Sequence, residues 1–130
     1  MTKTEAKTTK KTKSLRIPPQ VRLAVAAADA KQAVNVVVLD LRKAAGFTDF
    51  FVIASGTNTR QVRAIADAVI DAVAAKGGKP AYVEGYDHSE WILLDYFDFI
   101  VHVFGPETRV FYDLERLWGN ADRIEVAAEL

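Results

Sequence analysis

The sequence predicts a single α/β domain in which helices flank a mixed β-sheet. Two observations support this prediction. The chain has 130 residues, of which 50% are hydrophobic, and this length suits one domain with a substantial core. Segments with helical spacing of apolar residues alternate with short apolar runs, in the order helix, strand, strand, helix, three strands, helix.

The first elements follow from spacing and composition. Apolar residues at helical spacing predict a helix over 20–33. Apolar runs rich in β-branched or aromatic residues predict buried strands over 35–41 and 50–55, and Gly46 breaks the chain between them.

The clearest helix is predicted between Asn58 and the glycine pair at 77–78. Asn58 and Gln61 stand in the relation of N-cap and N3 residue, as in a capping box. The glycine pair favours the end of a helix, because glycine readily adopts a left-handed backbone.

Extended segments are predicted over 81–84, 91–95 and 98–104, followed by a helix over 107–118. Four apolar residues are expected on one face of this last helix: Val110, Phe111, Leu114 and Leu117.

Composition excludes several kinds of site. The chain has no cysteine, which excludes disulfides, thiolate metal sites and cysteine nucleophiles and permits a cytosol-like compartment. Its apolar runs are far shorter than the ~18 residues that a membrane span needs. The formal charge is zero, but residues 1–16 carry net +5 and the remainder net −5. A basic tail therefore precedes an acidic body.

The basic tail, which we assign to residues 1–17, is predicted to be disordered because it has almost nothing apolar to bury. Pro18 and Pro19 mark its boundary with the domain. A solvated tail and an arm that contacts phosphates non-specifically both fit this composition.

The segments 91–95 and 98–104 are predicted to pair as a hairpin through a two-residue turn at 96–97, with Asp95 opposite Asp98. Side chains alternate along a strand, so the hairpin has two faces. One is apolar and is expected under helices: Ile92, Leu94, Phe99, Val101 and Val103. The other, which we call the mixed face, holds Trp91, Leu93, Asp95, Asp98, Ile100, His102 and Phe104. A solvated sheet surface and a docking surface both fit the mixed face, and a one-residue change of register would exchange the two faces.

No catalytic constellation is evident. Ser55-Gly56-Thr57 could cradle a phosphate, but the segment lacks further glycines and a Gly-Lys-Ser/Thr sequence, so a turn and N-cap are favoured. The adjacent residues 88–90, His-Ser-Glu, point in different directions and cannot form a proton relay. Asp95 and Asp98 have no evident third ligand for a metal.

Six segments together resemble the ribosomal silencing factor family, also called the Iojap family. In chain order they are Thr48–Thr57, Arg60–Asp67, Glu84–Gly85, Trp91–Tyr96, Val101–Phe104 and Phe111–Trp118. The resemblance assigns residues 18–118 to the family domain and leaves 119–130 as a C-terminal extension.

The resemblance implies a nucleotidyltransferase-like fold without that chemistry. Active nucleotidyltransferases follow a Gly-Ser turn with two acidic residues, two positions apart on a strand, that hold metals. Here Ser55-Gly56 occupies the turn and the next carboxylate is Asp67, in a predicted helix. We therefore expect a protein that is not an enzyme and has no cofactor or metal. The competing enzyme hypothesis is a residual nucleotidyl or phosphoryl transferase that uses the turn at 55–59.

The resemblance further implies a translational repressor. Such a protein binds the large ribosomal subunit through the subunit's fourteenth ribosomal protein, blocks joining of the small subunit and lowers translation under nutrient limitation. We expect a cytoplasmic homodimer without membrane contact, and we expect any contact with ribosomal RNA to come from the basic tail. A large-subunit assembly factor would use the same docking site.

The contact residues of the family correspond to Trp91, Asp95, Tyr96 and His102, which largely coincide with the mixed face and favour the docking hypothesis. The site expected for the ribosomal protein is therefore Trp91, Leu93, Asp95, Tyr96, Asp98, His102 and Phe104. Phe97 departs from the family, which often has glycine there. This departure predicts either a longer turn or an additional exposed aromatic contact.

Overall fold

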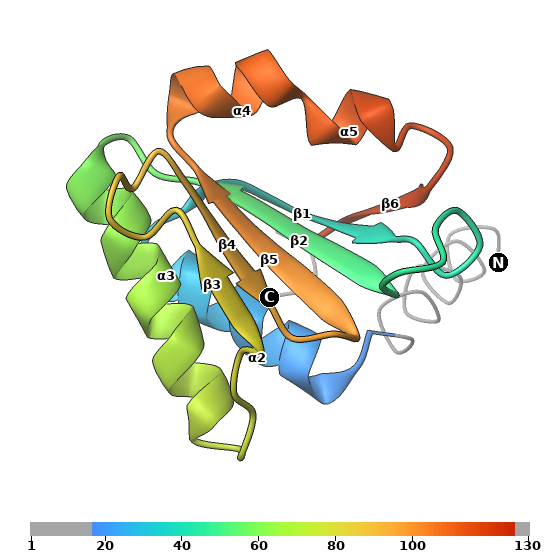
Figure 1. The fold of residues 1–130 in the computed structure, drawn as a ribbon, viewed down its shortest axis with the longest axis horizontal. Coiled ribbons are helices and arrows are strands. Elements are labelled where there is room, and N and C mark those ends of the chain that lie inside the picture. Colours follow the sequence, from blue (N-terminus) through green and yellow to red (C-terminus); the bar gives the residue numbers. More distant parts are fainter. Residues whose placement is uncertain (1–16, 127–130) are drawn as a thin grey trace, which may run out of the picture.

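A six-stranded mixed sheet lies between two layers of helices (Figure 1). The computed structural model describes residues 17–126, so nearly all of the predicted tail and the last residues of the predicted extension lie outside the described part. Helices α2 (Pro19–Ala30) and α3 (Thr59–Ala74) cover one face of the sheet. Helices α4 (Pro106–Tyr112) and α5 (Leu114–Leu117) lie over the other face.

The strand order is β3-β4-β5-β2-β1-β6. The strands are β1 (Val34–Asp40), β2 (Phe50–Ser55), β3 (Tyr82–Glu84), β4 (Trp91–Asp95), β5 (Phe99–Phe104) and β6 (Asp122–Glu125). β2 and β5 pair in parallel, and the other neighbours are antiparallel. The predicted mixed α/β domain is confirmed. No helix within residues 17–126 combines the length and the apolar character needed to cross a membrane.

The first core lies between the sheet and helices α2 and α3. All five residues of the predicted apolar hairpin face belong to it, so this prediction is confirmed. The N-cap of α3 is also as predicted: Asn58 Oδ1 accepts a hydrogen bond of 2.9 Å from the Gln61 N–H. Gln61 Oε1 in turn accepts from the Thr57 N–H at 2.7 Å.

The predicted hairpin register is wrong by two residues. Asp95 pairs with Ile100, and Trp91 pairs with Phe104, so the loop spans 96–98 instead of being a two-residue turn at 96–97. Phe97 adopts a φ of +70°, and the Tyr96 N–H donates to the Phe99 carbonyl across the longer loop. A shift by two residues preserves the alternation of side chains, so the two faces remain as predicted.

The predicted continuous helix over 107–118 is also wrong. Asp113 takes a left-handed conformation with a φ of +46° and separates α4 from α5. Leu114 packs on the sheet with the neighbouring Trp118, but Val110 and Phe111 are each 79% exposed. The helical stripe inferred from spacing does not exist, because the chain changes direction in its middle.

Strand β6 was not predicted, and it lies in the segment assigned to the C-terminal extension. It pairs with β1, with Ile124 opposite Val38, and it extends the sheet at the edge far from β4. Ile124 and Val126 are buried in the first core. The alternation of charged and apolar residues over 123–126 was the available signal.

Candidate functional site

The mixed face divides into an inner part and an outer part. A second core covers its β5 side, where Ile100, His102 and Phe104 are buried among residues of β1 and β2. Its β4 side is more open: Trp91, Leu93 and Asp95 are only partly buried. The part available to a partner is therefore the line of β4 side chains.

The structure places the remaining two predicted site residues in the loop after β4. Asp98 is exposed. Tyr96 is buried in the first core, where its ring stacks on Phe99 at 4.7 Å between centroids. Burial raises the pKa of the Tyr96 hydroxyl to about 12. The fold therefore brings five of the seven residues to the mixed face. It directs Tyr96 to the opposite layer and leaves Asp98 in the loop, at a hollow that α2 also lines.

Trp91 is fixed from three directions. Its ring stacks on Phe104 at 5.0 Å between centroids and contacts Tyr112 of α4 at 4.6 Å. Its indole Nε1–H donates a hydrogen bond of 3.0 Å to Nδ1 of His102. A partly buried aromatic held in one orientation loses little side-chain freedom when it binds a partner.

His102 is only 3% exposed. Because Nδ1 accepts the indole bond, the proton of the neutral imidazole resides on Nε2. Nε2 is buried and has no hydrogen-bond partner among residues 17–126, and the ring packs on Phe51 at 4.4 Å between centroids. Burial lowers the pKa of His102 to about 3. A neutral, enclosed imidazole supports Trp91 and is unsuited to act as a general base.

The aromatic surface continues onto α4, which the sequence reasoning did not anticipate. The Tyr112 ring links Trp91 to Phe111, whose ring lies 5.0 Å from that of Tyr112. Phe111 and Val110 project from α4 into solvent. The adjacent aromatics at 111 and 112 were the one available signal, because neighbours on a helix project about 100° apart and do not share one narrow buried stripe. We call Trp91, Leu93, Asp95, Phe111 and Tyr112 the docking surface.

A charged clamp holds α4 and α5 against the sheet. Arg109 donates to Glu115 Oε1 at 3.0 Å and to the Ser55 hydroxyl at 2.9 Å. Arg123 of β6 pairs with the other Glu115 oxygen at 2.9 Å. Burial alone would raise the pKa of Glu115, but the hydrogen bond and charge of Arg109, with the charge of Arg123, lower it overall.

Polar groups of the Ser55-Gly56-Thr57 turn already form hydrogen bonds with other residues of the chain. Ser55 accepts from Arg109, and the Thr57 N–H donates to Gln61. Gly56 is required for packing, because a Cβ there would lie 2.8 Å from the Val62 nitrogen. The geometry is that of a turn and N-cap, in agreement with the sequence-based preference.

Other polar clusters do not assemble a reactive site. Within residues 17–126, no three His, Asp or Glu side chains are grouped closely enough to hold a metal ion. Ser89 is buried and donates to the Tyr86 carbonyl at 2.8 Å while it accepts from Arg63 at 3.0 Å. The Asp95 carboxylate accepts from the Phe97 N–H at 2.8 Å.

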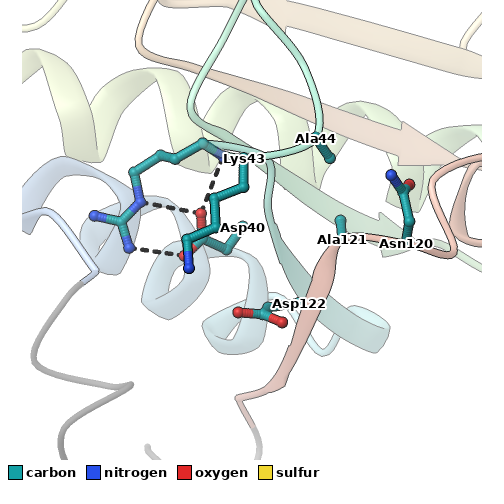
Figure 2. A pocket seen from close by; sticks show the side chains of 7 residues that line it. Asp40, Lys43, Ala44, Asn120, Ala121 and Asp122 are labelled. Atoms are coloured by element: carbon teal, nitrogen blue, oxygen red, sulfur yellow. Dashed lines mark hydrogen bonds and ion pairs between the residues drawn. The ribbon is translucent and has the colours of Figure 1, made fainter.

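A separate hollow of about 410 Å³ lies at the β1–β6 edge (Figure 2). Asp40 and Asp122 stand opposite each other across the two strands, an arrangement that is unfavourable without a nearby cation. Arg42 supplies the positive charge: its guanidinium donates two hydrogen bonds, of 2.7 and 3.0 Å, to the two carboxylate oxygens of Asp40. The hollow carries both charge signs and no aromatic side chain, and it lies at the far edge of the sheet from β4.

The structure is a mixed α/β domain with a fixed tryptophan beside exposed aromatic and acidic side chains. The profile of the family described as "Ribosomal silencing factor during starvation" matches residues 14–130. The chain belongs to the ribosomal silencing factor family.

Individual relatives agree with this assignment. A "Ribosomal silencing factor RsfS" from Halalkalibacterium halodurans is 39% identical over 106 residues, which cover 82% of this chain and 91% of that protein. A crystal structure of a Chromobacterium violaceum protein superposes with a TM-score of 0.75 at 33% identity, covering 77% of this chain and 83% of that one. The mouse protein named "Mitochondrial assembly of ribosomal large subunit protein 1" is 31% identical over 68% of this chain and 40% of its own length.

Proposed function

We propose that this chain is a non-enzymatic translational repressor that binds the large ribosomal subunit. In this proposal it binds through the subunit's fourteenth ribosomal protein, sterically blocks association with the small subunit and lowers translation when nutrients are limiting. Membership of the ribosomal silencing factor family and the docking surface around Trp91 support the proposal. Trp91 is the observation that carries it, since a fixed, partly buried tryptophan is the typical anchor of a protein interface.

The residues expected at the site take two roles. Trp91, Leu93, Asp95 and the exposed Asp98 can contact a partner directly. His102 and Phe104 are buried beneath Trp91 and act by holding it. A preorganised anchor of this kind improves affinity by reducing the entropy lost on binding.

Charge favours a basic protein as the partner. The body outside residues 1–16 carries net −5. On β3, Glu84 stands opposite Leu93 and Tyr82 opposite Asp95, and all four side chains are at least partly exposed. Acidic side chains beside an apolar centre attract a basic ribosomal protein and raise the rate of association.

Sedimentation tests the proposal. Purified large and small ribosomal subunits are mixed at a Mg²⁺ concentration that allows joining, with and without the protein. We expect the protein to sediment with the large subunit and joined ribosomes to decline. Trp91→Glu should abolish both effects, because loss of an interfacial tryptophan costs about 2 kcal/mol or more and a buried carboxylate adds to that cost.

Ala74→Glu is the matched control, since it introduces the same charge at an exposed position of α3, on the opposite layer. It should bind as the unmodified protein does. Undiminished binding by a folded Trp91→Glu variant would refute the proposed surface, and failure of the unmodified protein to sediment with the large subunit would refute the proposed function.

A large-subunit assembly factor is the second candidate. The name of the mouse relative, which refers to assembly of the ribosomal large subunit, favours it. The same docking surface would serve both functions. Binding to the large subunit without any decline in joined ribosomes would favour the assembly role.

The proposal also includes a cytoplasmic homodimer and a peripheral contact between the basic tail and ribosomal RNA. The six basic side chains within residues 1–16 support the RNA contact. Removal of these residues should flatten the dependence of large-subunit affinity on salt, because fewer counterions are then released from phosphates.

A further inference from the structure

Phe97 occupies the tip of the loop between β4 and β5, and its conformation is unusual for its size. It is 71% exposed, with a φ of +70°. The Asp98 N–H donates to the Tyr96 carbonyl at 2.9 Å, which makes Phe97 the central residue of a γ-turn with positive φ, the rare and strained form. Glycine adopts this backbone without strain, and a large side chain does not.

Other parts of the chain hold Phe97 in this conformation. Its N–H donates to Asp95 Oδ1 at 2.8 Å, and its carbonyl accepts from the Thr48 hydroxyl at 2.8 Å. The adjacent Asp98 carbonyl accepts from the Asp49 N–H at 3.0 Å. The backbone N–H and the carbonyl of Phe97 are therefore each fixed by a side chain, one from β4 and one from the segment before β2.

The phenyl ring contributes little to the fold. It stacks on no other ring in the described part of the chain, and most of its surface is in solvent. A strained backbone that supports an exposed aromatic suggests that the side chain is used outside the chain, since strain of this kind persists mainly at functional positions.

We propose that Phe97 is a second aromatic anchor, which extends the docking surface along β4 from Trp91 to the loop. This inference rests on the proposed function, because it assigns Phe97 the same partner, the ribosomal protein of the large subunit. Phe97 lies two residues beyond the end of β4 and six after Trp91. At ~3.3 Å per residue the two positions are at most ~20 Å apart, so both anchors fit within one interface of ordinary size.

The surroundings of Phe97 define the chemistry of the partner. Asp49 and Asp98 are exposed on either side of the hydrogen bond that joins their two loops. They also line a hollow beside α2 together with Arg22 and Lys76. Carboxylates next to an aromatic repel the phosphates of RNA and attract lysine and arginine. Residues 17–130 carry net −5 in total, so the occupant that fits is a basic protein surface with an apolar recess.

Phe97→Gly in the full-length chain tests the inference, because the anchor hypothesis and a structural role predict opposite changes. We expect affinity for purified large subunits, and for the isolated fourteenth ribosomal protein, to fall about tenfold, as for loss of a moderate interface anchor. The melting temperature should stay the same or rise, because glycine relieves the positive φ. Unchanged affinity would overturn the inference, as would a fall in affinity accompanied by an equivalent loss of stability.

Gln32→Gly is the matched control. Gln32 is also exposed, with a φ of +60°, but it lies after α2 and carries no aromatic ring. We expect its melting temperature to stay the same or rise while affinity is unchanged. Equal loss of affinity in both glycine variants would overturn the inference, because backbone flexibility and not the ring would then be responsible.

Comparing the binding of Trp91→Glu and Phe97→Gly distinguishes failure of this inference from failure of the proposed function. If Trp91→Glu abolishes binding and Phe97→Gly does not weaken it, only the second anchor is refuted. If Trp91→Glu binds normally, the proposed docking surface itself is refuted. Protein-free large-subunit RNA is the remaining probe, and weaker binding of Phe97→Gly to this RNA would overturn the assignment of a protein partner.

Discussion

The indole Nε1–H of Trp91 donates a 3.0 Å hydrogen bond to Nδ1 of His102, which lies diagonally across the β4–β5 pair. The donor is on a partly exposed residue and the acceptor is on a buried one. Because His102 is held in the second core, the bond restricts the orientation of the Trp91 ring at the surface. In this arrangement His102 is a positioning residue for the proposed anchor, and a partner need not touch it.

His102→Phe should weaken large-subunit binding without unfolding the domain. Phenylalanine fills a similar space but offers no acceptor, so Trp91 loses one orienting hydrogen bond, worth about 1 kcal/mol or roughly fivefold in affinity. The same change removes the unpartnered Nε2–H and leaves the indole N–H of the partly exposed Trp91 to bond with water. These effects oppose each other, so thermal stability should change little. Affinity and melting temperature are the two measurements.

His102→Asn provides the matched comparison. Its side chain retains an acceptor close to the position of Nδ1, but it leaves a void in the second core, which should cost about 2 kcal/mol or more in stability. The two variants should therefore rank in opposite order: asparagine binds better, and phenylalanine is more stable. If both properties rank the same way, His102 acts only through packing.

The folding stability should decrease as the pH falls from 6.5 toward 5. The pKa of His102 is lowered by burial to about 3 in the folded chain, against ~6.5 when the chain is unfolded. Between these values the unfolded state binds the proton and the folded state does not, so acidification favours unfolding. We expect a loss of about 2 kcal/mol between pH 7 and pH 5, measured by urea denaturation at both values.

His102→Phe isolates this contribution, since that variant lacks the titrating imidazole while the other histidine, His88, remains. Its stability should change far less between the two pH values. Equal losses in the two proteins would show that other groups cause the pH dependence.

Local patterns were sufficient to predict the faces of the hairpin but not its register. Alternation placed Ile92 and Leu94 on the helix side and Trp91 on the other, and a shift of two residues left this unchanged. The register itself depended on Phe97 adopting a positive φ, and this conformation is stabilised by Thr48, which is distant in sequence. Such a tertiary contact leaves no periodic signal in the sequence.

The β4 and β5 residues of the candidate site could be predicted from the sequence, but how deeply each of them is buried could not. The mixed character of the β4 side was evident from Trp91 and Asp95, whereas the burial of His102 and Phe104 depends on what covers β5. That cover includes Leu114, beyond a chain reversal at Asp113 that sequence spacing does not reveal. For the same reason Phe111 was expected on one helix face with Leu114, but Phe111 is exposed while Leu114 packs on the sheet.

The Arg109 clamp should control how firmly α4 and α5 are held to the sheet. Arg109→Met removes the contacts to Glu115 and Ser55 together with a 3.3 Å hydrogen bond to the Val34 carbonyl of β1. It leaves Glu115 paired with Arg123. Hydrogen bonds to charged groups contribute about 1.5–3 kcal/mol each, and neutral ones about 1. We therefore expect a loss of about 2–3 kcal/mol for Arg109→Met and about 1 kcal/mol for Ser55→Ala, both measured by chemical denaturation.

Amide hydrogen exchange should locate the effect. In Arg109→Met, exchange should accelerate over 106–118 more than over α3, because the clamp joins the first segment to the ends of β1 and β2 and does not contact the second. Arg116→Met is the control, since Arg116 is an exposed arginine of the same segment, and it should leave exchange unchanged. Uniform acceleration throughout Arg109→Met would mean that the clamp stabilises the whole domain and does not act locally on the helices beside Trp91.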